Sequence, residues 1–189
     1  MPTNIEIKAR ARDVDALAAR VRAIADSPGE TLEQRDTFFR CSDGRLKLRE
    51  TGTGRSELIW YRREDTAGSK RSEYLVMPVA DPASLRGLLD RAFGTVQVVR
   101  KSRRLFLVGQ TRIHLDQVEG LGIFMELEVV LHDGQPDSEG HAIAADLMRR
   151  LGIAPDDLVE GAYADLLAAG RDGESRPRES ARGLSPGRG

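Results

Sequence analysis

The sequence has little of what marks secreted, membrane-spanning and zinc-binding proteins. Its single cysteine, Cys41, excludes an intramolecular disulfide. The three histidines, His114, His132 and His141, do not stand with Cys41 at a spacing typical of a zinc site. No window reaches the roughly 18 consecutive apolar residues of a membrane-spanning helix, and residues 1–30 hold no leader-like apolar segment. We therefore expect a soluble, cytoplasmic protein whose chemistry uses oxygen and nitrogen ligands.

The chain also lacks an excess of charge of either sign. Lysine and arginine number 29 and aspartate and glutamate number 30, so the formal net charge at pH 7 is −1. A protein that coats nucleic acid needs a strongly basic surface, and the balance disfavours that class. We expect neither nucleic acid nor a membrane as a partner. A balanced total charge still allows a locally positive cavity.

With 189 residues, the chain is long enough for one domain that buries roughly 70% of its unfolded surface, and short for two cores. Residues 171–189 contain only two apolar residues, Ala181 and Leu184, and no aromatic one. Such a segment cannot bury enough surface to order itself. We therefore predict one domain over residues 1–170 and a disordered, solvated tail over residues 171–189.

Helical and strand-like segments divide the predicted domain between them. The apolar spacing of amphipathic helices occurs in Asp13–Ala25, Asp81–Phe93, Ser138–Leu151 and Asp156–Ala168. Asp13, Asp81 and Ser138 are suitable N-cap residues. The remaining runs alternate in polarity or are rich in β-branched and aromatic residues, as strands are. These runs are Thr3–Arg10, Thr31–Cys41, Arg45–Thr51, Ser56–Arg63, Lys70–Pro78, Thr95–Arg103, Arg104–Gly109, Thr111–Val118 and Ile123–His132.

The order of these elements predicts an α+β fold built on an antiparallel sheet. Ser42-Asp43-Gly44 and Gly109-Gln110 are hairpin turn signals, so consecutive strands should pair antiparallel. The sequence shows no internal repeat, no Gly-rich phosphate loop and no regular strand-helix-strand alternation. A dinucleotide-binding or P-loop fold is therefore not supported.

Charged residues alternate with apolar residues along the predicted strands. Glu6 and Lys8 lie on the opposite face from Ile5 and Ile7, and the pattern recurs in later strands. One interpretation is a solvated sheet face that carries cross-strand ion pairs. The other is a closed barrel of about eight strands, with the helices packed outside and a charged tunnel inside.

The set of charged residues favours the tunnel. The candidate inward cations are Lys8, Arg45, Lys47, Arg49, Arg62, Lys101, Arg103 and Arg112. The candidate inward carboxylates are Glu6, Glu73, Asp116, Glu126 and Glu128. An empty tunnel with more cations than carboxylates would repel itself, whereas a polyphosphate carrying a divalent cation would neutralise both groups.

Five motifs that follow one another along the chain resemble those of one known family. They are Ile5-Glu6-Ile7-Lys8, Gly44-Arg45-Leu46-Lys47-Leu48-Arg49-Glu50, Leu58-Ile59-Trp60-Tyr61-Arg62-Arg63, His114-Leu115-Asp116-Gln117-Val118-Glu119-Gly120-Leu121-Gly122 and Glu126-Leu127-Glu128. Together they resemble the CYTH family, which is named for class IV adenylyl cyclases and thiamine triphosphatase. The match runs from Asn4 to Leu167 and is closest to the cyclase-like branch. The resemblance implies a closed, eight-stranded antiparallel β-barrel whose tunnel binds a triphosphate and needs Mg²⁺ or Mn²⁺.

The resemblance also implies roles for individual residues. The divalent metal would be held by Glu6, Glu126 and Glu128, with Asp116 nearby. Phosphate oxygens would be bound by Lys47, Arg49, Arg62, Lys101 and Arg103, joined by Arg45 and Arg112 if the strand phase is right.

Three further residues have two interpretations each. Lys8, beside Glu6 in the catalytic motif, would orient or deprotonate the nucleophile, or else make another phosphate contact. His114 would face the tunnel beside Asp116 in a catalytic role, or serve as a structural histidine, which is the more frequent case. Glu73 would be a further tunnel carboxylate that orients an arginine.

One position departs from the family pattern. Asn4 stands where the E-x-E-x-K motif has its first glutamate. Asparagine can coordinate a metal through its carbonyl oxygen but brings no charge. The departure puts in doubt a second metal, or the full turnover of a typical member, and leaves the phosphate-binding face untouched.

Several functions fit this set of residues. We place first a class IV adenylyl cyclase-like enzyme, which converts ATP to cyclic AMP and pyrophosphate, because the motifs resemble that branch. The alternatives are a triphosphatase that hydrolyses inorganic triphosphate, thiamine triphosphate or another organic triphosphate, and a non-catalytic module that binds triphosphate or polyphosphate. A purely structural barrel with an ion-paired interior predicts no ligand. A homodimer is compatible with each of them.

Overall fold

Strands and helices follow one another within residues 1–174, which the computed structural model describes. The strands are β1 (Thr3–Arg10), β2 (Glu30–Phe39), β3 (Arg45–Thr51), β4 (Ser56–Arg63), β5 (Lys70–Pro78), β6 (Thr95–Val108), β7 (Thr111–Val118) and β8 (Gly122–Val130). The helices are α1 (Val14–Ile24), α2 (Pro82–Phe93), α3 (Asp137–Leu151) and α4 (Tyr163–Glu174), with a short 3₁₀ turn, η1, at Pro155–Asp157.

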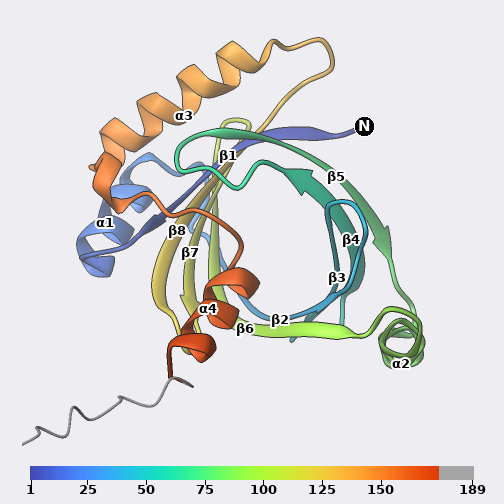
Figure 1. Ribbon diagram of the computed structural model, residues 1–189. Coiled ribbons are helices and arrows are strands. Elements are labelled where there is room, and N and C mark those ends of the chain that lie inside the picture. The colour runs from blue at the N-terminus through green and yellow to red at the C-terminus, as the bar shows by residue number, and fades with distance from the viewer. Residues whose placement is uncertain (175–189) are drawn as a thin grey trace, which may run out of the picture.

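The sheet closes on itself, which separates its charged face from its apolar face. The strands form an antiparallel barrel in the order β1-β5-β4-β3-β2-β6-β7-β8 (Figure 1). The helices lie around its outside and across one end. The predicted α+β fold with a closed eight-stranded barrel is thereby confirmed.

β1 shows how the alternating pattern produces a charged interior. Ile5, Ile7 and Ala9 face outward and are at most 1% exposed, because α1 and α3 cover them. Glu6 and Lys8 face the tunnel. Burial of each isoleucine contributes roughly 1.5–3 kcal/mol, so a shift of one residue, which would exchange the two faces, is strongly disfavoured.

β1 also closes the barrel. On one side it pairs with β8, where Glu6 lies opposite Glu128 and Lys8 lies opposite Glu126. On the other side it pairs with β5, where Glu6 lies opposite Lys70. The first strand thus joins two distant parts of the chain and brings the acidic residues of β8 next to its own.

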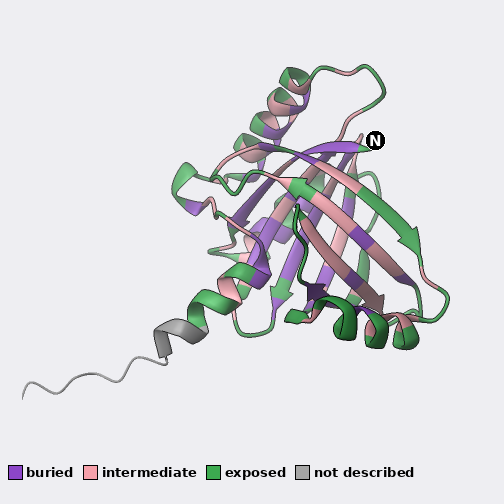
Figure 2. Cartoon of the chain, turned by 45° about the vertical axis from the view of Figure 1, so that its right-hand side comes forward, coloured by how far each residue is buried: buried purple, intermediate pink, exposed green. Residues whose placement is uncertain are grey.

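The helices cover the barrel unevenly. α1 and α3 lie side by side over β1 and β8 (Figure 1). α2 packs against β2 and β3, with Leu89 buried, and is otherwise largely exposed (Figure 2). α4 lies at one end of the tunnel, and its first residue, Tyr163, lines the cavity.

Two of the three predicted helix caps are confirmed. The side chain of Asp13 accepts a hydrogen bond from the Ala16 N–H at 3.0 Å, and that of Asp81 accepts one from the Ser84 N–H at 3.1 Å. The predicted cap at Ser138 is wrong, because α3 begins one residue earlier, after Pro136. Proline has no side-chain acceptor, so this helix start lacks a side-chain cap.

The predicted hairpin before β3 depends on Gly44. Its φ of +69° is disfavoured for residues with a side chain, and a Cβ there would lie 2.6 Å from the carbonyl oxygen of Tyr61. β2 and β3 then pair antiparallel, with Phe39 opposite Leu46. β6 and β7 form the second predicted hairpin, with Val108 opposite Thr111.

Two predicted boundaries were wrong. The runs Thr95–Arg103 and Arg104–Gly109 form one continuous strand, β6, because it pairs with β7 on both sides of that boundary. The predicted helix Asp156–Ala168 is divided into η1 and α4. Gly161, with a φ of +74°, lies in the irregular link between them and prevents a continuous helix.

α4 continues to Glu174, beyond the predicted domain end at residue 170. The rest of the predicted tail, residues 175–189, lies outside the described residues. None of the helices within residues 1–174 has the length and apolar character that a bilayer crossing requires.

Replacement of Gly140 by alanine tests the packing of α3 on the barrel. A Cβ at Gly140 would lie 2.5 Å from Ile5 Cγ1 and 2.7 Å from Leu131 Cδ2. Overpacking of this kind should lower the free energy of unfolding by about 1–3 kcal/mol. The matched control is Gly87→Ala on α2, where no atom lies within 4 Å of the new Cβ; there the better helix propensity of alanine should raise stability by about 0.5–1 kcal/mol. Urea denaturation measures both, and an unchanged Gly140→Ala stability would contradict this packing.

Candidate functional site

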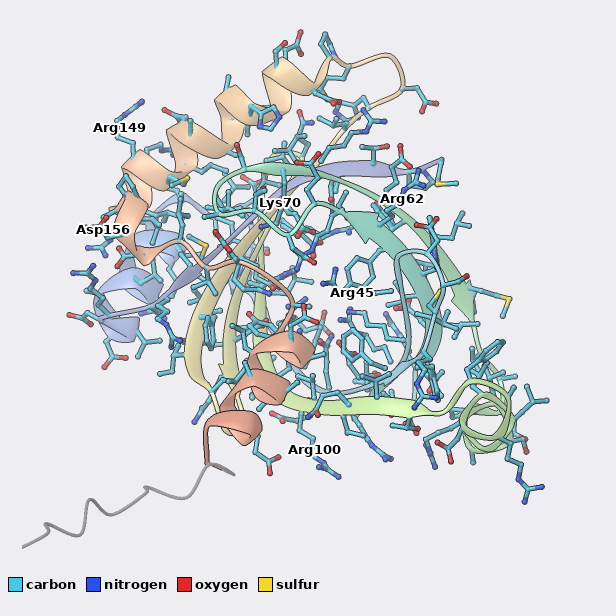
Figure 3. The ribbon with its side chains drawn as sticks, in the orientation of Figure 1. Arg45, Arg62, Lys70, Arg100, Arg149 and Asp156 are labelled. Atoms are coloured by element: carbon cyan, nitrogen blue, oxygen red, sulfur yellow. The ribbon has the colours of Figure 1, made fainter. Side chains whose placement is uncertain are left out.

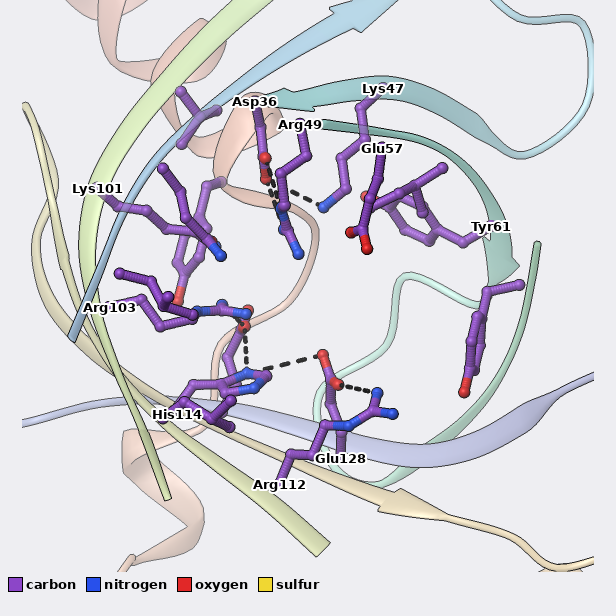
Figure 4. A pocket seen from close by; sticks show the side chains of 18 of the residues that line it. Asp36, Lys47, Arg49, Glu57, Tyr61, Lys101, Arg103, Arg112, His114 and Glu128 are labelled. Atoms are coloured by element: carbon purple, nitrogen blue, oxygen red, sulfur yellow. Dashed lines mark hydrogen bonds and ion pairs between the residues drawn. The ribbon is translucent and has the colours of Figure 1, made fainter. Parts of the chain in front are cut away.

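The barrel encloses a cavity of about 630 Å³ whose wall is rich in charged residues (Figure 4). The basic residues on its wall are Lys8, Lys47, Arg49, Arg55, Arg63, Lys101, Arg103 and Arg112. The acidic residues on its wall are Glu6, Glu30, Asp36, Glu57, Glu126 and Glu128. The charged face of the sheet therefore lies inside, as the tunnel interpretation predicts, and the solvated-face interpretation is wrong.

Asp116 on β7 is fully buried and gathers donors from two other elements. Arg103 on β6 donates two hydrogen bonds to its carboxylate, at 2.6 and 2.5 Å. Lys101 Nζ lies 3.3 Å from the same carboxylate, and the Tyr163 hydroxyl donates to it at 3.0 Å. Burial raises the pKa of Asp116, but the charges of Arg103 and Lys101 outweigh burial and hold that pKa below its ordinary value. Asp116 therefore stays ionised and fixes two cations at the wall.

Asp36 on β2 plays the same part on the opposite wall. Arg49 donates two hydrogen bonds to its carboxylate, both at 2.8 Å, and Lys47 donates one at 3.1 Å (Figure 4). Burial and the adjacent Arg49 charge together lower the pKa of Lys47 to about 7, despite the Asp36 carboxylate. Lys47 therefore titrates near neutral pH.

Lys8 is buried near the end of the tunnel that α4 covers. Its Nζ donates a hydrogen bond to the Gly161 carbonyl oxygen at 2.9 Å and lies 3.5 Å from Glu126 Oε1. It also lies 4.0 Å from the centre of the Tyr163 ring. Burial lowers the pKa of Lys8, although the Glu126 charge opposes the shift. A lysine with a lowered pKa can exchange a proton with a nucleophile.

His114, Glu126 and Glu128 form a compact cluster on β7 and β8. The Nδ1 atom of His114 lies 3.7 Å from a carboxylate oxygen of each glutamate (Figure 4). One ligand atom from each residue lies within 4.8 Å of the other two. Burial lowers the pKa of His114, and the Arg103 charge lowers it further, which favours the neutral imidazole. Two carboxylates and a neutral imidazole fit a divalent cation.

Most of the predicted site residues lie on this wall. They are Glu6, Lys8, Lys47, Arg49, Lys101, Arg103, Arg112, Glu126 and Glu128. Arg112 is partly exposed and donates to Glu128 at 3.5 Å. Glu6 forms an ion pair with Arg63, so it does not stand free as a ligand beside the two glutamates of β8.

Two residues predicted inside the tunnel, Arg62 and Glu73, lie outside it. The Arg62 side chain is 55% exposed and lies 3.2 Å from Glu73 Oε2. Its neighbour Arg63 is 5% exposed, pairs with Glu6 and donates to the Gly161 carbonyl oxygen at 3.0 Å. The predicted phase of β4 was therefore wrong by one residue, which exchanges the two faces of a strand.

Arg45 shares the inward phase of β3 but lies at the tunnel mouth rather than on the wall (Figure 3). It donates to Asp65 in the loop after β4 at 2.5 Å and to Asp165 on α4 at 2.8 Å. These two carboxylates balance its charge. Arg45 therefore connects β3 to α4, and its contacts do not support the predicted phosphate-binding role.

Three important residues were missed by the sequence analysis: Asp36, Arg63 and Tyr163. Asp36 had a signal, because Gln34, Asp36 and Phe38 share one face of a predicted strand. Arg63 adjoins Arg62, and the preceding apolar run gives no alternation to choose between them. Tyr163 had no signal, because the predicted helix ran through it.

Comparisons with known proteins agree with this architecture. The CYTH domain family model matches residues 2–163. Adenylate cyclase CyaB of Aeromonas hydrophila is 27% identical over 171 residues, which cover 86% of this chain and 87% of CyaB. The PH1012 protein of Pyrococcus horikoshii OT3 has a similar structure, with a TM-score of 0.76, 26% identity, and coverage of 87% of this chain and 99% of its own.

A plant protein shares the fold at lower identity. HpAC1 of Hippeastrum, an adenylyl cyclase by name for which a dominant triphosphatase activity is described, has a TM-score of 0.62 and 18% identity. The similarity covers 88% of this chain and 96% of HpAC1. At this identity the similarity shows the fold alone.

The corrected phase of β4 predicts which arginine binds a phosphate ligand. Replacement of Arg63 by glutamine should weaken metal-free binding of inorganic triphosphate by at least about tenfold, because a charge-assisted contact contributes roughly 1.5–3 kcal/mol. Replacement of the adjacent, exposed Arg62 should leave the affinity unchanged. Isothermal titration calorimetry measures both affinities, and the melting temperature of each unliganded variant controls for folding. Equal losses in the two variants would contradict the phase.

The lowered pKa of Lys47 predicts proton uptake on ligand binding. At pH 8 an amine with a pKa of about 7 is mostly neutral, and a bound triphosphate raises that pKa by its negative charge. Metal-free binding of triphosphate should therefore take up as much as about one proton at Lys47, so affinity should fall as pH rises above 7. Calorimetry in buffers of different ionisation enthalpy measures the uptake. It should be smaller in Lys47→Met, and equal uptake in the two proteins would refute the shift.

Proposed function

Because this chain belongs to the CYTH family, we propose that it is a divalent-metal-dependent enzyme that acts on a triphosphate inside the tunnel, converting ATP to cyclic AMP and pyrophosphate. The family includes adenylyl cyclase-like enzymes and triphosphatases. One observation carries the proposal: a closed cavity holds fixed cations on its wall and, beside them, the cluster of His114, Glu126 and Glu128. A triphosphate with its counter-cation needs both kinds of group in one place.

The cations form the phosphate-binding part of the site. Arg49 and Lys47 are anchored on Asp36, and Arg103 and Lys101 are anchored on Asp116. An anchored cation loses little side-chain freedom when a phosphate oxygen arrives, which favours binding. Arginine presents a planar fork to two oxygens, whereas lysine presents a point charge.

The same cavity also has apolar surface. Leu32, Ile59, Val76 and Leu105 line it together with the charged groups. Such residues would give an organic group a surface to contact, which inorganic triphosphate does not need. Their presence supports a nucleotide or another organic triphosphate as the substrate.

The glutamates of β8 are the ligands that we assign to the metal, which supplies positive charge to the phosphate oxygens when it is bound. Glu126 and Glu128 lie two residues apart on one strand, so both side chains point into the tunnel. Asp116 lies nearby, as predicted, but its oxygens already accept from Arg103, Lys101 and Tyr163. We therefore assign Asp116 to positioning of the cations.

Lys8 is the group that we assign to proton transfer. In the cyclase reaction the 3′-hydroxyl of the substrate attacks the α-phosphorus, and pyrophosphate leaves. Lys8 in its neutral form would accept the hydroxyl proton, and its contacts with Glu126 and the Gly161 carbonyl oxygen would hold the resulting ammonium ion. Arg49 and Arg103 would stabilise charge that develops on the phosphate oxygens.

Two other functions use the same wall. A triphosphatase would activate water in place of the 3′-hydroxyl, and one protein with this fold, HpAC1, has a dominant triphosphatase activity. A non-catalytic triphosphate-binding module is favoured by Asn4, which brings no charge to the position of the family's first glutamate. Glu126 and Glu128 count against the module, because carboxylates inside an anion site weaken simple anion binding.

The products made from three substrates distinguish these functions. The protein should convert ATP with Mg²⁺ or Mn²⁺ into cyclic AMP and pyrophosphate, which chromatography identifies. Orthophosphate release from ATP, inorganic triphosphate or thiamine triphosphate would show a hydrolase, and binding without turnover would show the module. Glu128→Gln should lower turnover at least about a hundredfold, the level of a lost electrostatic contribution to catalysis. Its control, Glu119→Gln in the exposed turn before β8, should retain full turnover.

A further inference from the structure

The buried imidazole of His114 has a nitrogen that nothing in the described structure satisfies. The side chain is 4% exposed, and Nδ1 has no hydrogen-bond partner among residues 1–174. Buried polar atoms are hydrogen-bonded or bound to an ion or water in the great majority of cases. The unpartnered nitrogen therefore points to a ligand.

The nearest polar atoms to Nδ1 are arranged around a point that a cation can occupy. Glu126 Oε2 and Glu128 Oε1 each lie 3.7 Å from Nδ1, too far for a hydrogen bond. Two metal–ligand bonds of about 2.1 Å span at most about 4.2 Å, so one cation can reach the nitrogen and either oxygen together. All three ligand atoms lie within 4.8 Å of one another, which leaves only a small side-chain rotation.

Neighbouring contacts hold the three side chains in this arrangement. Glu126 accepts a hydrogen bond from Arg103 at 2.6 Å, and Glu128 accepts one from Arg112 at 3.5 Å. Register places His114 directly opposite Glu126 on paired strands. Metal ligands are commonly positioned by such outer contacts.

We infer that His114 Nδ1 coordinates the divalent metal together with Glu126 and Glu128, and so makes the site selective for Mn²⁺ over Mg²⁺. The inference rests on the metal-dependent function proposed above, and adds a ligand and a preference to it. Imidazole nitrogen suits transition metals, whereas Mg²⁺ prefers oxygen ligands and keeps its waters. His114 is thereby a specificity-determining residue for the metal.

Pulsed electron paramagnetic resonance of bound Mn²⁺ tests this assignment directly. The untagged full-length protein is mixed with less than one equivalent of Mn²⁺, with and without inorganic triphosphate, and frozen. A directly bound histidine nitrogen modulates the electron spin echo, and ¹⁵N-histidine labelling changes that modulation. The signal should be present in the wild type, and present in His141→Gln, whose imidazole contacts Ser69 instead. It should be absent in His114→Gln.

Metal affinity supplies a second readout. Calorimetric titration should show that His114→Gln binds Mn²⁺ at least about tenfold more weakly, while its Mg²⁺ affinity changes less than about threefold. A double variant, His132→Gln with His141→Gln, keeps His114 as the only histidine and tests it in its native surroundings should His114→Gln fail to fold.

The outcomes separate this inference from the proposed function. Bound Mn²⁺ with histidine modulation that disappears in His114→Gln supports it. Bound Mn²⁺ without nitrogen modulation overturns the role of His114 and leaves the metal-dependent function standing. Absence of Mn²⁺ binding in all proteins, with and without triphosphate, overturns both.

Discussion

The ionised, buried carboxylate of Asp116 is the interaction on which the rest of the site depends. Its side chain has no exposed surface, yet it holds Lys101, Arg103 and Tyr163 in contact. Without it, two like charges would be buried side by side, a loss that typically costs about 3–5 kcal/mol. Asp36 solves the same problem across the tunnel. The cations are therefore in position before any phosphate arrives, which is the condition for electrostatic catalysis.

The architecture could be predicted because the tunnel demands opposite chemistry on the two faces of each strand. In β1 the isoleucines must meet the helices and Glu6 must meet the cavity, so the alternation is unambiguous. The prediction failed where that contrast is missing. In Leu58–Arg63 an apolar run precedes two arginines, and either one could face inward until the pairing of β4 with β5 is known.

The site was only partly predictable because some of its contacts join segments that are far apart in the sequence. The carboxylates of β8 and the cations of β3 and β6 could be named from alternation and family resemblance. Tyr163 could not, because its value comes from α4 crossing the tunnel end, where its hydroxyl reaches Asp116 and its ring meets Lys8. Arg45 was misjudged for the same reason, since Asp65 and Asp165 approach it only in the folded chain.

The position of β1 between β5 and β8 determines when the barrel can assemble. Asn4 must find Ser72 on one side and Val130 on the other, and both partners lie far along the chain. The entropy of closing such loops is lost before the paired strands repay it, so folding should be slow compared with that of a protein rich in local contacts. On the ribosome, β1 must also wait for β8 to emerge. The charged wall therefore forms as a late event, after nearly all of the domain has been synthesised.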